Sequence, residues 1–384
     1  MKKIGIICEY NPFHNGHLYH INKIKEMYPE SIIILVMSGN FTQRGEVSII
    51  NKWDKTDIAL NYGVNIVIEL PFVFAVQSAD TFAHASIQIL SALNVDAIVF
   101  GSETNDIKKL TMLAKTQINN KEYDKLVQKK LEEGINYPTA LSKALFEITG
   151  KKVEKPNDIL GISYIREILL QKAKITPICI KRNNDYNSIE LNNSISSATS
   201  IRYALEHNEN VTSYVPEKTS VYLEKNLHFT NQYFSLLKFM IMTHINELNK
   251  FQTVDEGIEN RIKKYITRAV NYDDLILKIK TKRYTYTKLS RMFTHIICNF
   301  TKEEAKKFKN IEYIRILGFD SKGKQYLNEI KKEIQIPLIT NFSSIKSEML
   351  ELEYRTTCVY ASILNENEKI KMIESEYKNT PIMK

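Results

Sequence analysis

Residues 3–28 read KIGIICEYNPFHNGHLYHINKIKEMY and set the pattern for the first half of the chain. The apolar run at residues 3–8 is short and does not alternate with polar residues, which is typical of a β-strand covered on both faces. A polar segment with Asn11, Pro12 and Gly16 follows it, and apolar residues then recur with helical spacing. This order of strand, loop and helix is the repeating unit of a parallel α/β sheet.

The same unit recurs along the first 180 residues. Further apolar, β-branched runs are SIIILVMSG (31–39), NIVIELPFVF (65–74), VDAIVFGSE (95–103) and TPICIKRN (176–183). Helical patterns lie between them at KWDKTDIALNYG (52–63) and ADTFAHASIQILSALN (79–94). The alternation predicts a doubly wound parallel sheet with right-handed crossovers.

Two segments depart from this alternation. Residues 107–155 are charged and purely helical in pattern, which predicts a helical insertion in an α/β domain of residues 1–205. Beyond residue 205, strand patterns nearly vanish and helical spacing prevails, so we expect residues 206–384 to form a second, mostly helical domain. Within it, Gly318 and Gly323 are expected to mark turns around a loop.

Composition bounds the class of protein. The 384 residues are 43% hydrophobic and 25% charged, which suits a globular chain of about two domains at ~150 residues each. The net charge of +9 makes polyanions plausible partners. Four scattered cysteines without a CxxC pair indicate reduced thiols and a cytoplasmic location. Apolar stretches fall short of the ~20 residues that a membrane helix needs, so we expect no membrane association.

Ligands bind an open parallel sheet beyond the carboxyl ends of its strands, so the segment after the first strand is a candidate ligand site. Gly16 allows close approach of a ligand to a helix N-terminus, whose unpaired N–H groups suit phosphate. His14 and His17 lie three residues apart and can donate hydrogen bonds to the same anion. Two alternatives remain: a metal site, which needs further ligands, and a solvent-facing helix cap.

The segment with His14 and His17 resembles a known sequence signature. His14-Asn15-Gly16-His17 resembles the HxGH signature of the nucleotidyltransferase superfamily, whose two histidines contact ATP phosphates. The companion motif of that superfamily, ISSTxIR, has a counterpart with one extra residue at Ile195–Arg202, ISSATSIR. Serine and threonine hydroxyls at a helix start, followed by an arginine, also favour a triphosphate.

Further stretches narrow the resemblance to the bacterial tRNA-Met cytidine acetate ligase family. They are GIICEYNPFHNGHLYHI (5–21), VMSGNFTQRGE (36–46), VFGSE (99–103), KPNDILGISYI (155–165), SSATSIR (196–202) and TKRYTYTKLSR (281–291). The resemblance implies a Rossmann-like nucleotidyltransferase domain that uses ATP to activate acetate as acetyl-adenylate. It further implies transfer of the acetyl group to N4 of the wobble cytidine, position 34, of elongator tRNA-Met.

The resemblance also implies the residues of the site. His14, His17 and Arg202 are expected to stabilise the pyrophosphate leaving group. The expected ATP-binding residues are Ile7, Cys8, Glu9, Tyr10, Asn11, Pro12, Phe13, His14, Asn15, Gly16, His17, Leu18, Tyr19, His20, Gly101, Asn157, Arg182, Ser197 and Thr199. Mg²⁺ is expected to accompany ATP, as phosphoryl chemistry commonly requires, with no protein ligand assigned to it.

Local alternatives stay open for three of these positions. Gly101 either admits a base or ribose across the strand ends or simply ends a strand. Asn157 either binds adenine or ribose or caps the helix that follows it. Arg182 either grips phosphate or is an exposed charge at a strand end. From topology alone, the loop with Ser38, Gly39 and Asn40 is placed near the acetate or the incoming cytidine.

A basic stretch at residues 261–291 predicts the RNA-binding surface. Its cations and tyrosines are interleaved, which suits phosphate contacts combined with base stacking. The alternative is a solvated helix face whose lysine stems pack on tyrosine. The expected tRNA-binding residues are Lys278, Lys280, Lys282, Arg283, Tyr284, Tyr286, Lys288 and Arg291.

Two other functions compete with the ligase. The HxGH stretch alone equally permits a small-molecule adenylyltransferase of coenzyme biosynthesis, although such an enzyme has little use for a large basic second domain. A non-catalytic, nucleotide-responsive RNA-binding protein is the other alternative. We expect no DNA partner.

Overall fold

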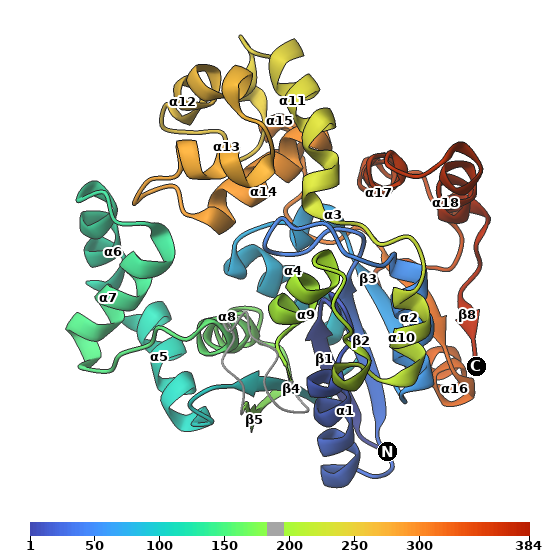
Figure 1. Ribbon diagram of the computed structural model, residues 1–384. Coiled ribbons are helices and arrows are strands. Elements are labelled where there is room, and N and C mark those ends of the chain that lie inside the picture. The colour runs from blue at the N-terminus through green and yellow to red at the C-terminus, as the bar shows by residue number, and fades with distance from the viewer. Residues whose placement is uncertain (183–195) are drawn as a thin grey trace.

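The computed structural model describes residues 1–182 and 196–384 and contains one mixed sheet in the order β5-β4-β1-β2-β3-β6-β7, with β8 also paired to β6 (Figure 1). All pairings are parallel except that of β3 with β6. The strands are β1 (Lys3–Cys8), β2 (Ile32–Ser38), β3 (Ile66–Leu70), β4 (Ala97–Ser102), β5 (Thr176–Lys181), β6 (Ile314–Phe319), β7 (Leu338–Ile339) and β8 (Ile382–Met383).

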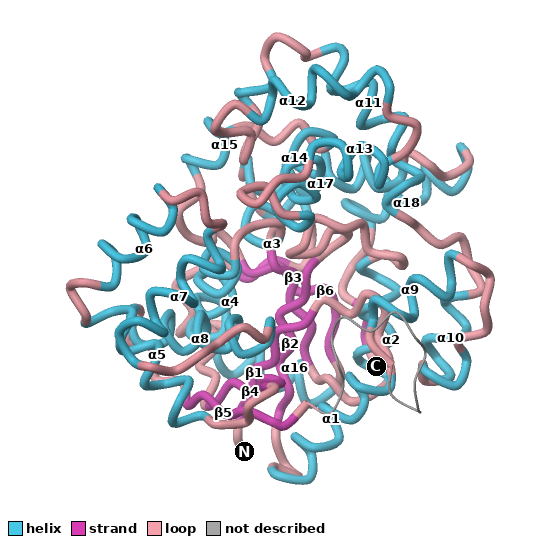
Figure 2. The backbone as a smooth tube through the Cα atoms, turned by 60° about the vertical axis from the view of Figure 1, so that its left-hand side comes forward, coloured by secondary structure: helices cyan, strands magenta, loops and turns pink. Residues whose placement is uncertain are grey.

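Helices cover both faces of the sheet, as the unalternating strands predict (Figure 2). Along β2, Ile33 and Leu35 pack in the cluster that holds α1 (Asn15–Met27), α2 (Lys52–Asn61) and α9 (Ala198–Glu206). Ile32 and Ile34 pack in the other cluster, with α4 (Ala79–Ala92) and α8 (Pro156–Leu170). Successive side chains of a strand point to opposite faces, so every position of β2 is buried.

The predicted insertion is helical. Between β4 and α8 lie α5 (Ile107–Asn119), α6 (Tyr123–Glu132) and α7 (Tyr137–Thr149), which project to the left in Figure 1. Helix α8 then returns to pack against α4 and β4 and completes the crossover to β5.

A second group of helices lies beyond the strand ends, at the top of Figure 1. Its members are α11 (Phe234–Thr243), α12 (Ile258–Tyr265), α13 (Tyr272–Ile279), α14 (Tyr286–Ile297) and α15 (Lys302–Lys307). The chain reaches it from α9 through α10 (Glu217–Leu223). In the described part of the chain, none of the helices is long and apolar enough to span a membrane.

The last 70 residues correct the sequence prediction. Strand β6 returns to the sheet beside β3, so the end of the sheet does not coincide with the boundary expected at residue 205. Gly318 lies within β6 and Gly323 within α16 (Ser321–Ile330), not in turns. Each allows close packing: an added Cβ at Gly318 would meet Thr56 Cγ2 at 2.7 Å, and one at Gly323 would meet the Asn65 carbonyl oxygen at 2.2 Å.

A second correction concerns the run NIVIELPFVF. Pro71 lacks an N–H group and ends β3, and the apolar residues after it form one helical turn, α3 (Phe72–Ala75). A short apolar run does not distinguish a strand from a buried helical turn, which is why the pattern predicted a longer strand.

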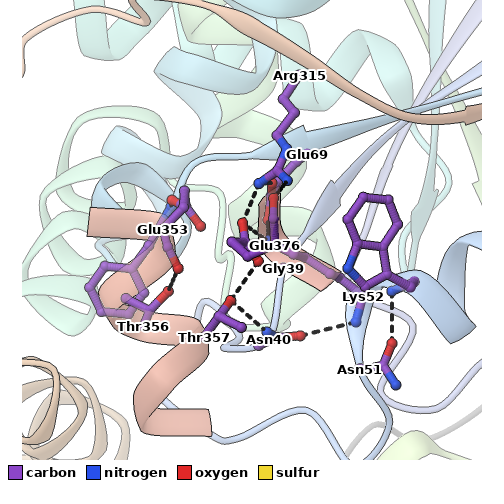
Figure 3. A network of polar contacts seen from close by, with 12 residues as sticks. Gly39, Asn40, Asn51, Lys52, Glu69, Arg315, Glu353, Thr356, Thr357 and Glu376 are labelled. Atoms are coloured by element: carbon purple, nitrogen blue, oxygen red, sulfur yellow. Dashed lines mark hydrogen bonds and ion pairs between the residues drawn. The ribbon is translucent and has the colours of Figure 1, made fainter. Parts of the chain in front are cut away.

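A buried ionic cluster ties the C-terminal helix α18 (Glu366–Lys378) to the sheet (Figure 3). Lys52 Nζ lies 2.7 Å from Glu69 Oε1 and 2.8 Å from Glu376 Oε1, and Arg315 forms ion pairs with the same two carboxylates. All four side chains are buried, so each charge depends on its partners. The cluster joins α2, β3, β6 and α18.

Candidate active site

The carboxyl ends of β1, β4 and β5 and the N-terminus of α1 surround a pocket, which we call the inner pocket. In the sheet order, β2 lies on one side of β1 and β4 on the other, so the strand order reverses at β1. Ligands bind open parallel sheets at such a switch point, and the pocket lies there. Its lining residues are Ile7, Cys8, His14, Gly16, His17, Tyr19, His20, Phe100, Gly101, Asn157, Leu160, Tyr164, Ile180, Lys181 and Arg182.

His14 and His17 cap α1 reciprocally. His14 is the N-cap residue, and its Nδ1 accepts a hydrogen bond from the Gly16 N–H at 3.0 Å. His17 Nδ1 in turn accepts from the His14 N–H at 3.2 Å. Both rings therefore use Nδ1 as an acceptor, which requires the tautomer that carries its proton on Nε2. A role in the helix cap and a role in phosphate binding are thus compatible, because each ring uses Nδ1 for the cap and keeps Nε2–H for a phosphate.

Both histidines are neutral in this environment. Burial, together with the charges of Arg182 and Arg202, lowers the pKa of His14 to about 3. Burial and the neighbouring His14 also lower the pKa of His17. A neutral imidazole with its proton on Nε2 donates one hydrogen bond without adding a charge. The N-terminus of α1 adds the partial positive charge that favours an anion at this point.

Asn157 and Arg182 line the pocket and are joined with Glu103 in one chain of hydrogen bonds. Asn157 Nδ2 donates to Glu103 Oε1 at 2.6 Å, and Arg182 Nη1 donates to Asn157 Oδ1 at 3.2 Å. Glu103 Oε2 also accepts from the Asp158 N–H at 3.0 Å, so Glu103, and not Asn157, satisfies the start of α8. Asn157 is therefore held in the pocket wall and does not serve as the helix cap.

Gly101 admits a neighbouring side chain. A Cβ at this position would meet Arg182 Cδ at 2.8 Å and Cγ at 2.9 Å, so the arginine stem lies across the glycine. Gly101 lines the inner pocket, where its neighbour is the Arg182 side chain, and its contact with a base or ribose stays a prediction.

The apolar wall of the pocket was not predicted. Phe100, Leu160, Tyr164 and Ile180 line it beside the polar groups. A signal was present in the sequence, because Asn157, Leu160 and Tyr164 have the spacing of one helix face. Such a wall suits a planar base.

A second cleft, the outer cleft, continues from the inner pocket and shares Ile7, Cys8, His14, His17, Asn157, Leu160, Tyr164 and Arg182 with it. The predicted residues that line the outer cleft but not the inner pocket are Glu9, Tyr10, Asn11, Ser197, Thr199 and Arg202. Arg202 Nη1 donates to the Asn11 carbonyl oxygen at 2.7 Å, and Nη2 donates to Glu46 Oε2 at 2.6 Å. Ser197 caps α9 through a hydrogen bond from the Ser200 N–H. Ile195, the first residue of the ISSATSIR stretch, lies outside the described residues.

Four predicted residues of the 7–20 segment line neither space. Pro12, Phe13, Asn15 and Leu18 shape the loop and its packing instead. Phe13 is fully buried against Tyr10 and Tyr62, and Asn15 Nδ2 donates to the Ser213 carbonyl oxygen at 3.0 Å.

Ser38, Gly39 and Asn40 are buried and line neither space, although the topology placed them near the acetate or the incoming cytidine. The reason is Lys55, a buried lysine whose Nζ donates to the carbonyl oxygens of Ser38 and Gly39 at 2.8 and 2.7 Å. Asn40 Oδ1 accepts from the Lys52 N–H at 3.0 Å. The residues of the same loop that do reach the outer cleft are Gln43, Arg44 and Glu46.

The predicted RNA-binding residues divide into exposed and packed groups. Tyr284 is 4% exposed and donates to the Asp255 carbonyl oxygen, with Lys288 Nζ 4.0 Å from its ring centroid. That side chain is part of the fold and cannot stack on a base, as the alternative of lysine stems on tyrosine foresaw. Tyr286, in contrast, is 40% exposed. Lys280 and Lys282 are exposed as well.

Arg291 is also partly buried. Burial lowers its pKa to about 10, and the charge of Arg44 acts in the same direction. Its helix α14 packs directly on the loop of the outer cleft: Ser290 Oγ and Thr294 Oγ1 donate to the Gly45 carbonyl oxygen at 3.0 and 2.6 Å. The helical group is thereby attached to the loop that lines the site.

The described residues contain no group of three or more His, Cys, Asp or Glu side chains that could hold a metal ion. The histidines of the site are therefore not part of a metal cluster within that part of the chain.

Comparisons with known proteins agree with this geometry. The family model described as HIGH Nucleotidyl Transferase matches residues 1–376. A Geobacillus protein named tRNA(Met) cytidine acetate ligase is 42% identical, and one from Oceanobacillus iheyensis is 40% identical; each alignment covers 100% of both chains. The crystal structure of apo Thermotoga maritima TmcAL matches with a TM-score of 0.92 and 32% identity, covering 100% of this chain and 99% of the other. A second structure of that protein, bound with alpha-thio ATP, matches with a TM-score of 0.90.

Proposed function

Because this chain belongs to the HIGH nucleotidyl transferase family and to the tRNA(Met) cytidine acetate ligases, we propose that it activates acetate with ATP and acetylates N4 of the wobble cytidine of elongator tRNA-Met. ATP is a substrate, and AMP and diphosphate are released. The observation that carries the proposal is the reciprocal cap of His14 and His17, which presents two neutral Nε2–H donors at a helix N-terminus.

The inner pocket and the outer cleft divide the nucleotide between them. The apolar wall of Phe100, Leu160 and Tyr164 suits the adenine ring, and Asn157 and Arg182 stand where both spaces meet. The triphosphate then passes His14 and His17 toward Arg202. A nucleotide in this orientation passes from the inner pocket into the outer cleft, and for this reason the two spaces share lining residues.

In the first step, an acetate oxygen attacks the α-phosphorus and the bond to the β-phosphate oxygen breaks. Pyrophosphate leaves with the electron pair of that bond. The Nε2–H groups of His14 and His17, the charge of Arg202 and the helix N-terminus stabilise the leaving group. Arg202 is already fixed by Asn11 and Glu46, so it requires little reordering when the nucleotide binds.

In the second step, the cytidine amine attacks the acetyl carbonyl carbon. A third pocket supplies a route for the RNA, because it shares Glu46, Thr199 and Arg202 with the outer cleft and continues to Tyr203 and Tyr286. Both tyrosines are partly exposed, and aromatic rings of this kind stack on unpaired bases. Exposed Lys280 and Lys282 lie in the same stretch as Tyr286 and suit phosphate contacts.

The functional division follows from this arrangement. Residues 1–205 form the ATP-binding catalytic part, and residues 206–384 contribute the tRNA-binding helices as well as β6. Mg²⁺ would neutralise phosphate charge when bound with ATP, and no residue of this chain is assigned to it. The partners are tRNA and acetate, with no DNA and no membrane, and the location is the cytoplasm.

Acetate-dependent exchange of labelled pyrophosphate into ATP tests the first step without RNA. The ligase predicts exchange that requires acetate. Exchange that ignores acetate but requires a phosphorylated coenzyme precursor would indicate a small-molecule adenylyltransferase. Absence of any exchange, together with tRNA binding, would indicate a non-catalytic RNA-binding protein.

A further inference from the structure

Glu9 is a carboxylate in the site that the ATP chemistry does not explain. It follows β1 directly and lines the outer cleft but not the inner pocket. A negative group beside a triphosphate site disfavours nucleotide binding, since like charges repel at short range. Its presence therefore indicates another task at this position.

The side chain is held in place by one of its two oxygens. Glu9 Oε1 accepts from the Gln43 N–H at 2.5 Å and from Ser38 Oγ at 3.4 Å. Among the described residues, none donates a hydrogen bond to Oε2. Glu9 thus has a fixed orientation, and its Oε2 keeps its capacity to accept a hydrogen bond or a proton.

The buried surroundings of Glu9 favour proton uptake. Burial raises the pKa of its carboxyl group above the usual range, and the hydrogen bond from Gln43 opposes that rise. The charged and titratable groups that face it come from β1, the loop after β2, α2 and α8: they are Cys8, Arg44, Glu46, Lys55 and Tyr164. A carboxylate with a raised pKa is a better proton acceptor near neutral pH.

Among the described residues, Glu46 is the other carboxylate that lines the outer cleft, and it is ion-paired with Arg202 at 2.6 Å. His14 and His17 use Nδ1 as acceptors within the helix cap, and their Nε2 atoms carry protons. Glu9 is therefore the group in the cleft best placed to accept a proton.

We propose that Glu9 is the general base of the acetyl-transfer step, which rests on the function proposed above. The adenosine of acetyl-adenylate occupies the inner pocket, and its acetyl end lies in the outer cleft beside Glu9. As N4 of cytidine forms a bond to the acetyl carbon, the bond from that carbon to the phosphate oxygen breaks and AMP leaves with the electron pair. Glu9 takes the proton that N4 loses. Such help is needed because the lone pair of N4 is delocalised into the ring, which makes the amine a weak nucleophile.

The test separates the two steps with Glu9→Gln in the full chain. Glutamine keeps an oxygen that accepts from the Gln43 N–H, so the loop is retained. Acetate-dependent ATP–pyrophosphate exchange should stay within about threefold of the parent enzyme, while single-turnover transfer from preformed acetyl-adenylate to tRNA-Met should fall at least ~100-fold. Hydroxylamine, a strong nucleophile that needs no base, should still capture the acetyl group at the parental rate.

Two further variants sharpen the result. Ser38→Ala removes the weaker hydrogen bond to Glu9 and should leave both steps within about threefold, and Glu9→Asp should retain part of the transfer because it keeps a carboxylate. Equal loss of exchange and transfer in Glu9→Gln would overturn the proposal, because it would assign Glu9 to binding or folding. Transfer within threefold of the parent would overturn it as well. If the parent enzyme itself fails to acetylate tRNA, the proposed function fails, and this outcome is recognisable before any variant is made.

Discussion

The backbone N–H of His14 donates to Nδ1 of His17 at 3.2 Å, and this single bond fixes which nitrogen of His17 faces the ligand. His14 is fixed in the same way by the N–H of Gly16. The spacing of the HxGH motif thus has a local reason: residues three apart can cap one another only at the first turn of a helix. The motif unites a structural cap with a pair of phosphate donors.

Replacing His14 separates its role as the N-cap of α1 from its role as a hydrogen-bond donor to phosphate. Asparagine is a favoured N-cap residue, so His14→Asn should keep the thermal midpoint within ~2 °C of the parent while acetate-dependent ATP–pyrophosphate exchange falls by ~10²-fold. His14→Ala loses both functions and should be less stable by ~1 kcal/mol as well. Thermal unfolding and exchange rates, measured on both variants, check this prediction. Full exchange activity in His14→Asn would show that the imidazole is only a cap.

The RNA surface is tested by two neighbouring tyrosines. Tyr286→Ala should weaken tRNA binding by ~1–3 kcal/mol, the usual contribution of one stacked base. Tyr284→Phe keeps the buried ring and removes only the hydroxyl bond to Asp255, so tRNA affinity should not change. Filter binding at one fixed salt concentration measures both. Equal losses in the two variants would contradict the assignment of Tyr286 to the surface that contacts RNA.

Glu376 tests the attachment of the C-terminal helix α18. Burial opposes ionisation of this carboxyl group, but Arg315 and Lys52 outweigh it and hold the pKa at about 2. Glu376→Gln leaves these two buried cations short of one partner, and the free energy of unfolding should fall by ~3–5 kcal/mol. Glu374, two residues earlier, pairs with Lys378 at the surface, so Glu374→Gln should cost no more than ~0.5 kcal/mol. Denaturant unfolding of both variants would contradict this account if their losses were equal.

His295 makes stability depend on pH. It is fully buried, with Nε2 2.8 Å from the Val76 carbonyl oxygen, and burial lowers its pKa from 6.5 to about 4. Its stabilising contribution is complete above pH ~6.5 and is lost as the pH falls toward ~4, because the unfolded chain binds the proton first. At ~1.4 kcal/mol per pKa unit, the loss is about 3 kcal/mol.

His295→Gln should therefore reduce the slope of unfolding free energy against pH between 6.5 and 4 by about one proton. Urea unfolding at several pH values measures that slope. The matched control is His207→Gln, at an exposed histidine, which should leave the slope as it is in the parent chain. An unchanged slope in His295→Gln would refute the prediction.

Short-range patterns predicted the parallel part of the fold and the core of the site. Residues 3–28 hold a strand, a loop and a capped helix within one continuous segment, so local spacing was sufficient to place His14 and His17. Strand β6 was missed because it pairs with β3 across more than 240 residues and carries Arg315 as its second residue, a buried charge that is neutralised by Glu69 and Glu376.

The errors at the site also have long-range causes. Ser38–Asn40 looked like a ligand loop, but Lys52 and Lys55 arrive from α2 and occupy its polar groups. Tyr284 and Tyr286 looked equivalent in sequence, yet only the packing of α14 and its neighbours decides which of them is exposed. Burial of a polar or aromatic group by a distant element leaves no local pattern in the sequence.

The central claim is most directly tested by nucleoside mass spectrometry of unmodified elongator tRNA-Met after incubation with the purified chain, ATP and acetate. We predict N4-acetylcytidine at position 34, which carries the label when labelled acetate is supplied and is absent when ATP is omitted. An unmodified cytidine at that position under the complete conditions would contradict the account.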